Sequence, residues 1–275
     1  MLRATSWICG IALLLAGFPL WAGNGTKIYS FGIPPQQSAT IIAERWTPVM
    51  QYLSQKTGFN IQLKTEKDIA TYTHKLGHGD YDFGVASPLQ YIIARKAGGV
   101  EAIAKEQNGK TVGLIFVRKN GPIQSVEQLN NQTVAFPGPT AFASNVLPLN
   151  YLNSKKVAVN IQYVVSLDSA YLSVAKGFFQ AGGGELRTFN GLAPDIKDGL
   201  RVIWESNAYP PFAFFAHPGV SKDVINTVQT ALVEMGDTLQ GQTLLKTVNF
   251  TKLEKADDHD YDAMRKLNIK PPATK

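Results

Sequence analysis

Cysteine is almost absent from this chain of 275 residues: its single cysteine, Cys9, lies in an apolar stretch at the N-terminus. The rest of the chain therefore has no disulfide, no thiol nucleophile and no cysteine metal ligand. A chain without such cross-links depends on the burial of its apolar core for stability.

Runs of like charge are also missing. Lysines and arginines are spread along the chain without five in a row, and the formal net charge is +6. This pattern argues against a nucleic-acid partner. A mildly basic surface is compatible with attracting an anion and equally with simple solubility. The chain also has no internal repeat and no low-complexity segment.

Motifs of common enzymes and metal sites do not occur either. There is no GxSxG and no GxxxxGK[ST] sequence. His74 and His78 are four residues apart, but no glutamate stands where a zinc protease needs its base. The acidic residues 257–260 lack the glycine and distal glutamate of a calcium loop, so a solvated turn that caps a helix is the better interpretation. We expect no enzyme activity, no metal and no cofactor.

The N-terminal residues predict export. Arg3 precedes an apolar run, and Ala22 is a small residue at a plausible cleavage point. The run is too short to cross a bilayer comfortably, and a buried helix is disfavoured because the stretch has no polar face. Residues 1–22 are therefore predicted to be a signal peptide, and a cysteine-free exported chain fits the periplasm.

The remaining chain alternates between strand and helix patterns, which predicts α/β layers. Residues 38–57 carry Ile42, Trp46, Val49 and Leu53 at helical spacing, and Gly58 ends the helix. Asp68 can cap a helix that runs to about residue 78. Ser125 and Gln128 have the spacing of a capping box. Further strands are predicted at 59–63, 81–86, 111–117, 133–136, 161–165, 178–181, 202–204 and 212–216, and further helices at 88–96, 169–176 and 225–239.

Polar turns follow two of the predicted strands. Pro34, Pro35 and Gln36 follow the strand that starts at Lys27, and Ser87 follows the strand 81–86 and opens a helix. Turns that lead from parallel strands into helices gather at one edge of a sheet, where free amide groups can meet a ligand. The sequence therefore predicts a binding cleft.

From about Lys27 to Leu267 the chain resembles the periplasmic substrate-binding proteins of phosphate, phosphite and phosphonate ABC transporters. Each motif is short, and their order and spacing carry the resemblance. The motifs are Phe31-Gly32-Ile33-Pro34-Pro35-Gln36, Gly79-Asp80-Tyr81-Asp82-Phe83, Ser87-Pro88 with Tyr91, Ile123-Gln124-Ser125-Val126-Glu127-Gln128-Leu129, Val134-Ala135-Phe136 with Pro148, and Val202-Ile203-Trp204-Glu205-Ser206 before Pro210.

The resemblance implies a type II periplasmic-binding-protein fold of two α/β lobes, each a mixed sheet flanked by helices, joined by two crossover strands. The first lobe would comprise residues 23–109 and 208–275, and the second lobe residues 110–207. A small molecule would bind between the lobes, and closure would present a changed surface to a membrane permease. We expect a monomer. The alternative is a sensory receptor that passes its ligand state to a membrane histidine kinase or cyclase.

The chain departs from the family pattern where an anion should bind. Phosphonate binders carry a Ser-Thr-Ser-like run after the strand that corresponds to 133–136, whereas this chain has Ala141-Phe142-Ala143, between Thr140 and Ser144. A hydrogen bond to a charged group contributes about 1.5–3 kcal/mol, so the loss of two or three predicts phosphonate binding that is weaker by about a hundredfold or more. The acidic residue that family members often carry after a later proline turn is also not evident at 210–213. We therefore expect a changed ligand, less charged or more aromatic.

Each predicted site residue also has an ordinary structural role as an alternative. Tyrosines at strand ends often pack half-buried. Ser87 and Asp168 precede predicted helices, where either could be a cap. Gly183, within a run of glycines, could form a flexible turn instead of admitting a ligand. The predicted ligand-binding residues are Tyr29, Pro35, Ser87, Tyr91, Thr140, Ala141, Phe142, Ala143, Ser144, Asp168, Gly183 and Tyr209.

Overall fold

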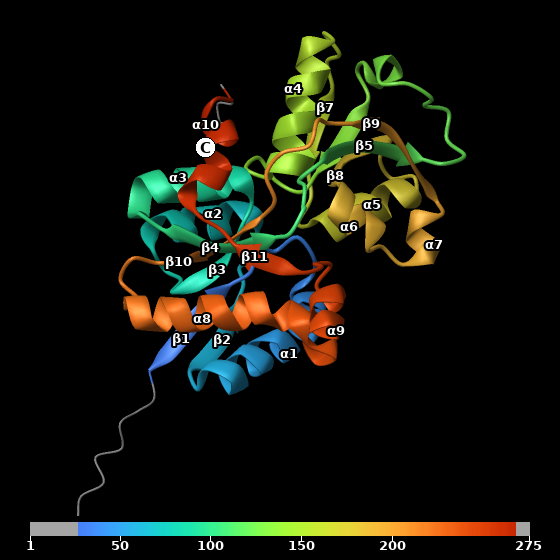
Figure 1. Cartoon of the computed structure of the whole chain (residues 1–275). Helices are drawn as coiled ribbons and strands as arrows, with labels where there is room; N and C mark the ends of the chain where they lie inside the picture. The colour runs from blue at the N-terminus through green and yellow to red at the C-terminus, as the bar shows by residue number, and fades with distance from the viewer. Residues whose placement is uncertain (1–26, 268–275) are drawn as a thin grey trace, which may run out of the picture.

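The computed structural model describes residues 27–267, whose strands form two separate sheets (Figure 1). The predicted signal peptide, residues 1–22, lies outside the described residues. We call the six-stranded sheet and its helices the first lobe, and the five-stranded sheet and its helices the second lobe. In Figure 1 the first lobe lies at the lower left and the second at the upper right.

The sheet of the first lobe is mixed. Strand β1 pairs in parallel with β2 and β3, whereas β10 is antiparallel to β3 and β4, and β11 is antiparallel to β4. Across the sheet the order is β11 (Leu253–Lys255), β4 (Glu101–Glu106), β10 (Ala213–Ala216), β3 (Phe83–Ala86), β1 (Ile28–Gly32) and β2 (Asn60–Lys64).

Helices cover both faces of this sheet (Figure 1). On one face Trp46 of α1 and Leu232 of α8 pack in one core with Phe31 of β1. On the other face Tyr72 of α2 and Tyr91 of α3 belong to a second core. The helices are α1 (Ala39–Thr57), α2 (Ile69–His78), α3 (Pro88–Gly98), α8 (Lys222–Glu234), η3 (Met235–Asp237), α9 (Leu239–Thr247), η4 (Asp258–Tyr261) and α10 (Asp262–Arg265).

The sheet of the second lobe is also mixed. Strand β6 pairs in parallel with β7 and β8, and β5 is antiparallel to β8 and β9. The order is β7 (Asn160–Tyr163), β6 (Thr133–Phe136), β8 (Ala181–Glu185), β5 (Gly113–Arg118) and β9 (Leu200–Glu205). The helices are η1 (Glu127–Leu129), the π-helical turn η2 (Phe142–Val146), α4 (Leu147–Ser154), α5 (Leu167–Ala175), α6 (Leu186–Asn190) and α7 (Pro194–Lys197). The two lobes confirm the predicted α/β fold with mixed sheets.

The chain passes between the lobes twice, from β4 to β5 and from β9 to β10. The two passages lie side by side, because Thr111 and Tyr209 form an antiparallel bridge. The Thr111 amide donates to the Tyr209 carbonyl at 3.0 Å, and the Tyr209 amide donates to the Thr111 carbonyl at 2.9 Å. The lobe boundaries at 109/110 and 207/208 stay a prediction.

Local capping chemistry sets the ends of several helices, as predicted for Asp68 and Gly58. The capping box predicted at Ser125 and Gln128 is wrong, because η1 starts after Val126 without a side-chain cap. Ser38 and Asp68 cap α1 and α2, and each side chain accepts a hydrogen bond from a first-turn amide. Ser87 and Gln90 form a capping box at the start of α3. Gly58 ends α1 with φ 73°, a left-handed conformation that favours glycine.

The prediction of a single helix over 225–239 is wrong at its end. Helix α8 ends at Glu234, and the 3-10 turn η3 separates it from α9. The side chain of Thr238 accepts a hydrogen bond from the Gly241 amide and so caps a new helix.

The prediction for the glycine run in the second lobe is also wrong. The strand was expected at 178–181 with the glycines after it, but β8 begins at Ala181 and contains them. A Cβ at Gly182 would lie 2.4 Å from the Phe116 ring, and one at Gly184 would lie 2.8 Å from the Tyr171 hydroxyl. These glycines are required by close packing on both faces of the sheet.

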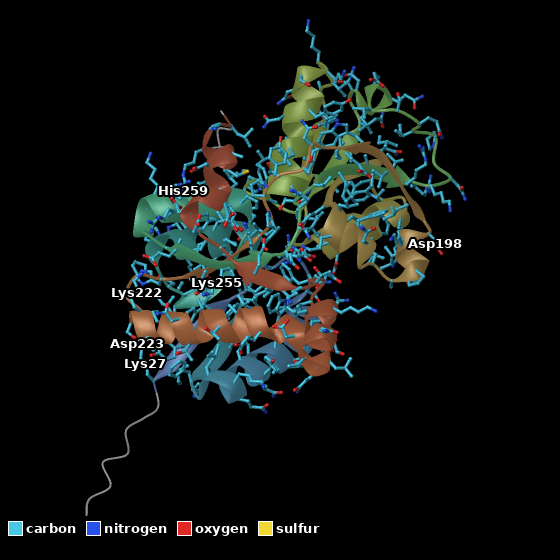
Figure 2. The ribbon with its side chains drawn as sticks, in the orientation of Figure 1. Lys27, Asp198, Lys222, Asp223, Lys255 and His259 are labelled. Carbon is cyan, nitrogen blue, oxygen red and sulfur yellow. The ribbon has the colours of Figure 1, made fainter. Side chains whose placement is uncertain are left out.

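The C-terminal segment of the described chain touches both lobes. Met264 packs in one cluster with Leu89 of α3 and Phe142 of η2. Asp258 anchors the segment, since its carboxylate accepts hydrogen bonds from the Tyr91 hydroxyl at 2.8 Å and from Arg265 at 2.6 Å. Burial alone would raise the pKa of Asp258, but these hydrogen bonds outweigh it and lower the pKa. Asp257 caps η4, which carries the exposed His259 (Figure 2). The predicted role of residues 257–260 as the cap of the last helix is wrong, because α10 starts after Tyr261 without a side-chain cap.

Candidate functional site

A small cavity of about 20 Å³ lies between the two lobes. Most of its wall comes from the segments that follow β1, β3 and β6 and from Glu185 at the end of β8, and Ile69 and Phe212 complete it. These strands are parallel neighbours within each sheet, β1 beside β3 and β6 beside β8, so their carboxyl ends meet at one edge. The lining residues are Pro34, Gln36, Ile69, Ser87, Gln90, Ala141, Phe142, Ala143, Ser144, Glu185 and Phe212. We call this cavity the interlobe pocket.

Two helix starts face the interlobe pocket. Helix α3 begins there, and the side chain and amide of Ser87 are both engaged by Gln90 in the capping box. The turn η2 begins there as well and runs directly into α4. Within η2 the first carbonyl acceptor, that of Ala141, bonds with the amides of Asn145 and Val146. The amides of Phe142, Ala143 and Ser144 come before these bonds, so they can serve as donors to a ligand.

Side-chain hydroxyls contribute little at this helix start. The Thr140 hydroxyl lies 3.4 Å from that of Thr73, which also accepts a hydrogen bond from the Gln90 side chain at 2.7 Å. Ser144 lines the interlobe pocket and is buried. The wall formed by residues 141–143 has no hydroxyl group, as the sequence indicated. Its donors are backbone amides.

Glu185 brings a carboxylate into the interlobe pocket. It is 1% exposed, and among the described residues that line the pocket it is the charged one. The Gln36 side-chain amide donates to Oε2 of Glu185 at 2.7 Å, and Nη2 of Arg187 donates to Oε1 at 3.3 Å. Sequence reasoning missed Glu185, although an acidic residue that directly follows a run of strand glycines could have identified it.

Gln36 and Arg187 also join the two lobes. The Gln36 carbonyl accepts a hydrogen bond from the Leu167 amide at 2.9 Å, and its side-chain oxygen accepts one from Arg187 at 3.2 Å. The Arg187 guanidinium lies 4.5 Å from the ring centre of Phe212 and 4.6 Å from that of Phe250, both in the first lobe. Gln36, Arg187 and Phe212 are not among the residues predicted to bind the ligand.

A second cavity, of about 30 Å³, adjoins the interlobe pocket. The two cavities share Pro34, Gln36 and Phe212 in their walls. The rest of the second wall is mainly apolar and includes Trp46 and Phe250, with Arg187 at its polar side. Gln36 therefore lies in the wall between the two cavities, whereas Arg187 lines the second one.

The structure brings several predicted residues together. Ser87, Ala141, Phe142, Ala143 and Ser144 all line the interlobe pocket. Thr140 lies next to them. The Tyr209 ring packs edge-on against Phe142, with ring centres 5.3 Å apart. Gly183 lies behind the pocket wall, where a Cβ would be only 2.0 Å from the Ser144 carbonyl oxygen.

Other predicted residues lie outside the interlobe pocket. Tyr29 packs against Phe59 and Phe83 in the first-lobe core. The Tyr91 hydroxyl bonds with Asp258 and with the Ala102 amide. Pro35 is buried but does not line the cavity.

Asp168 lies in the first turn of α5, and the cap of that helix is Ser166. Burial raises the pKa of Asp168, although the nearby Arg45 and hydrogen bonds from Gln37 and Ser38 act to lower it. Asp168 therefore faces the start of α1 in the first lobe and not the interlobe pocket.

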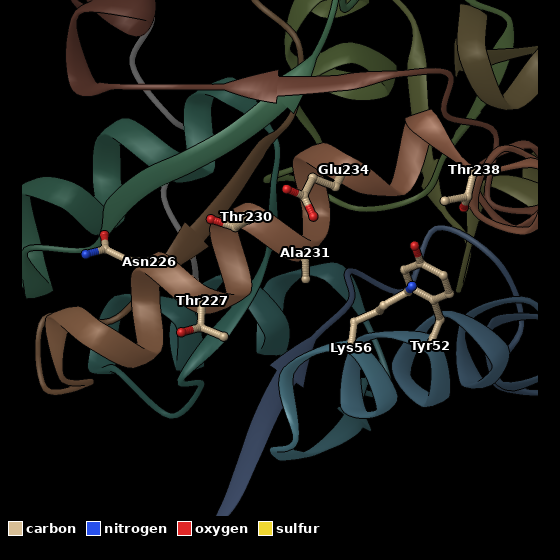
Figure 3. Close-up of a pocket in the computed structure, with 8 residues that line it drawn as sticks. All are labelled: Tyr52, Lys56, Asn226, Thr227, Thr230, Ala231, Glu234 and Thr238. Atoms are coloured by element: carbon tan, nitrogen blue, oxygen red, sulfur yellow. The ribbon is translucent and has the colours of Figure 1, made fainter.

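A wider groove lies elsewhere. Its volume is about 390 Å³, and it runs between α1 and α8 on the outer side of the first lobe (Figure 3). Figure 3 shows Tyr52 and Lys56 on α1 opposite Thr227, Ala231 and Glu234 on α8. The groove receives no residue from the second lobe, and no predicted ligand-binding residue lines it.

Residues 27–267 show neither a metal-binding cluster nor a membrane-spanning helix. This part of the chain contains no group of three or more His, Cys, Asp or Glu side chains that could hold a metal ion. His74 and His78 stack on each other with ring centres 4.1 Å apart. Within the same residues, no helix combines the length and apolar character that a bilayer crossing needs.

A family model matches residues 31–261, described as the periplasmic substrate-binding protein of a phosphonate ABC transporter. Among solved structures, a binding protein component of an ABC phosphonate transporter from Pseudomonas aeruginosa has a TM-score of 0.80 at 18% identity, over 87% of this chain and 85% of that one. PhnD1 from Prochlorococcus marinus, in complex with methylphosphonate, has a TM-score of 0.79 at 16% identity, over 87% and 96%. XAC2383 from Xanthomonas citri, bound to ATP, has a TM-score of 0.68 at 15% identity, over 86% and 94%. At these identities the structural likenesses show the fold.

Proposed function

Because this chain belongs to the family of periplasmic substrate-binding proteins of phosphonate ABC transporters, we propose that its interlobe pocket captures a small solute of low net charge. Proteins of this family bind small molecules and deliver them to a membrane permease, and they are not enzymes. The proposal concerns the ligand, which would accept hydrogen bonds from the amides of η2 and would carry little negative charge.

The observation that carries this proposal is the pairing of amide donors with a buried carboxylate. The amides of residues 142–144 favour an oxygen of the ligand, because helix starts carry partial positive charge. Glu185 lines the same cavity and opposes a second negative charge. At an effective dielectric constant of 20, two like charges 4 Å apart repel by about 4 kcal/mol. Arg187 offsets part of this repulsion, since it pairs with Glu185.

The missing hydroxyl groups also favour a ligand of low negative charge. A dianionic phosphonate group has three oxygens that need donors, and the Ala141-Phe142-Ala143 wall offers amides alone. A singly charged or neutral group needs fewer charge-assisted hydrogen bonds, so it loses less when hydroxyls are absent. The interlobe pocket therefore fits a solute such as a phosphonate monoester better than a free phosphonate.

Calorimetric titration of the protein purified from the periplasm tests the proposal. The probes are methylphosphonate, inorganic phosphate and the monomethyl ester of methylphosphonate, which has one negative charge fewer and one methyl group more at the same tetrahedral phosphorus. We expect the ester to bind at least about tenfold more tightly than methylphosphonate, the value of one charge-assisted hydrogen bond or more. Tighter binding of methylphosphonate or phosphate than of the ester would contradict the proposal.

A variant pair links this result to the carboxylate. Glu185→Gln keeps the shape of the side chain. We expect it to raise the affinity for methylphosphonate and to reduce the difference in affinity between methylphosphonate and its monomethyl ester. The matched control is Glu254→Gln on β11, outside the interlobe pocket. The control should leave both affinities unchanged.

A further inference from the structure

The charge of Glu185 is balanced from within the protein. A carboxylate that is 1% exposed needs a counter-charge or hydrogen bonds to remain ionised. Gln36 and Arg187 provide both, at 2.7 Å to one oxygen and 3.3 Å to the other. An ammonium group of a ligand would have to find its place at the same two oxygens.

Arg187 is held in this place by more than the carboxylate. Its guanidinium lies over the rings of Phe212 and Phe250 in the opposite lobe, at 4.5 and 4.6 Å from their centres. Such cation-π contacts stabilise the position of the guanidinium, and more strongly as the cation is desolvated. Its side chain is only 15% exposed. Displacement of Arg187 would break both ring contacts and the ion pair with Glu185.

We propose that Arg187 occupies the place of a ligand ammonium group and thereby makes the interlobe pocket select against amino-bearing solutes. This inference rests on the proposed function, since it describes the selectivity of the same pocket. An incoming ammonium group would meet a carboxylate whose oxygens are already bonded and a guanidinium of like charge beside it. A methyl group at the same position of the solute would meet neither penalty.

The test compares two solutes of the same length. Propylphosphonate ends in a methyl group where 2-aminoethylphosphonate ends in an ammonium group. In Arg187→Gln we expect the preference to shift toward 2-aminoethylphosphonate by about tenfold or more, the value of a charge-assisted hydrogen bond to the freed Glu185. An unchanged ratio of the two dissociation constants, in a variant that still melts cooperatively, would overturn the inference.

Two control variants separate selectivity from structure. Arg201→Gln removes an arginine of the second lobe that bonds to the Ile123 carbonyl and to Gln124, away from the interlobe pocket. It should keep the wild-type ratio. Arg187→Lys preserves the positive charge, and we expect it to restore most of the wild-type preference, which a purely steric role would not explain.

A double-mutant cycle, measured by thermal unfolding, tests whether Arg187 is the counter-ion of Glu185, and it needs no solute. If Arg187 balances Glu185, Arg187→Gln lowers the melting temperature more in the wild type than in a Glu185→Gln background, because the second variant has no buried charge to leave unpaired. Equal losses in both backgrounds would overturn the inference. If neither phosphonate bound the wild type or Arg187→Gln, the ligand of the proposed function would be wrong, and the cycle would still decide the role of Arg187.

Discussion

Replacement of Gly183 by alanine is expected to lower the free energy of unfolding by about 3 kcal/mol or more, at or beyond the upper end for an overpacked core. The new Cβ would lie 2.0 Å from the Ser144 carbonyl oxygen and 2.6 Å from a carbon of the Phe136 ring. The first contact is with backbone and the second with a fully buried side chain, so neither neighbour can move away cheaply. Strand β8 and turn η2 would have to separate.

Equilibrium unfolding in urea measures this loss. The matched control is Gly77→Ala in α2, where an added Cβ meets nothing within 4 Å. The same methyl group should there stabilise the protein by about 0.5–1 kcal/mol, because alanine loses less conformational freedom than glycine in a helix. A denaturation midpoint for Gly183→Ala equal to that of the wild type would show that β8 and η2 are not tightly joined.

Serines at positions 141 and 143 are expected to raise the affinity for methylphosphonate by about a hundredfold, the value of two hydrogen bonds to a charged group. Ala141 and Ala143 both line the interlobe pocket at the start of η2. Their side chains are 6% and 5% exposed, so a hydroxyl there would face a bound solute and not bulk water. The gain should appear in spite of Glu185, since the carboxylate is present in both proteins.

Titration of the Ala141→Ser, Ala143→Ser protein with methylphosphonate measures this gain. The control carries Ala39→Ser and Ala43→Ser, two exposed alanines of α1. It adds the same atoms away from the interlobe pocket and should bind as the wild type does. An affinity that matches the control would mean that residues 141–143 do not contact the phosphonate group.

The parts of the fold that sequence predicts well are those set by neighbouring residues. Asp68 and Gly58 determine helix ends through their own side chain or backbone, and both were identified correctly. Helix α1 also follows from the spacing of its buried residues alone.

The errors arise where packing from distant residues decides. The glycines of β8 are in a strand because Phe116, Ser144 and Tyr171 press on them, and none of these is near in sequence. Strand β4 was missed, although β10 and β11 pair with it on its two sides. Such partners are fixed by the completed sheet and not by the strand itself.

In the candidate site, too, placements set by the order of elements were predicted correctly, and placements set by distant packing were not. Ser87 and residues 141–144 line the interlobe pocket, as predicted, because they follow parallel strands. The order of strands and helices along the sequence is enough to predict this placement. Tyr91 does not line the pocket, whereas its neighbour Gln90 does. Successive residues of a helix point about 100° apart, so the face that meets a cavity is decided by how α3 packs. The remaining predicted contacts stay predictions.

Met264 belongs to one buried cluster with Leu89 of the first lobe and Phe142 of the second, which gives the end of the described chain a mechanical role. The segment is anchored on the first lobe through Asp258 and Tyr91, and its methionine packs in a cluster that both lobes build. Separation of the two lobes would break up that cluster. A fluorescent dye placed at the solvent-exposed His259, in the same segment, is expected to report such a separation by a change of emission.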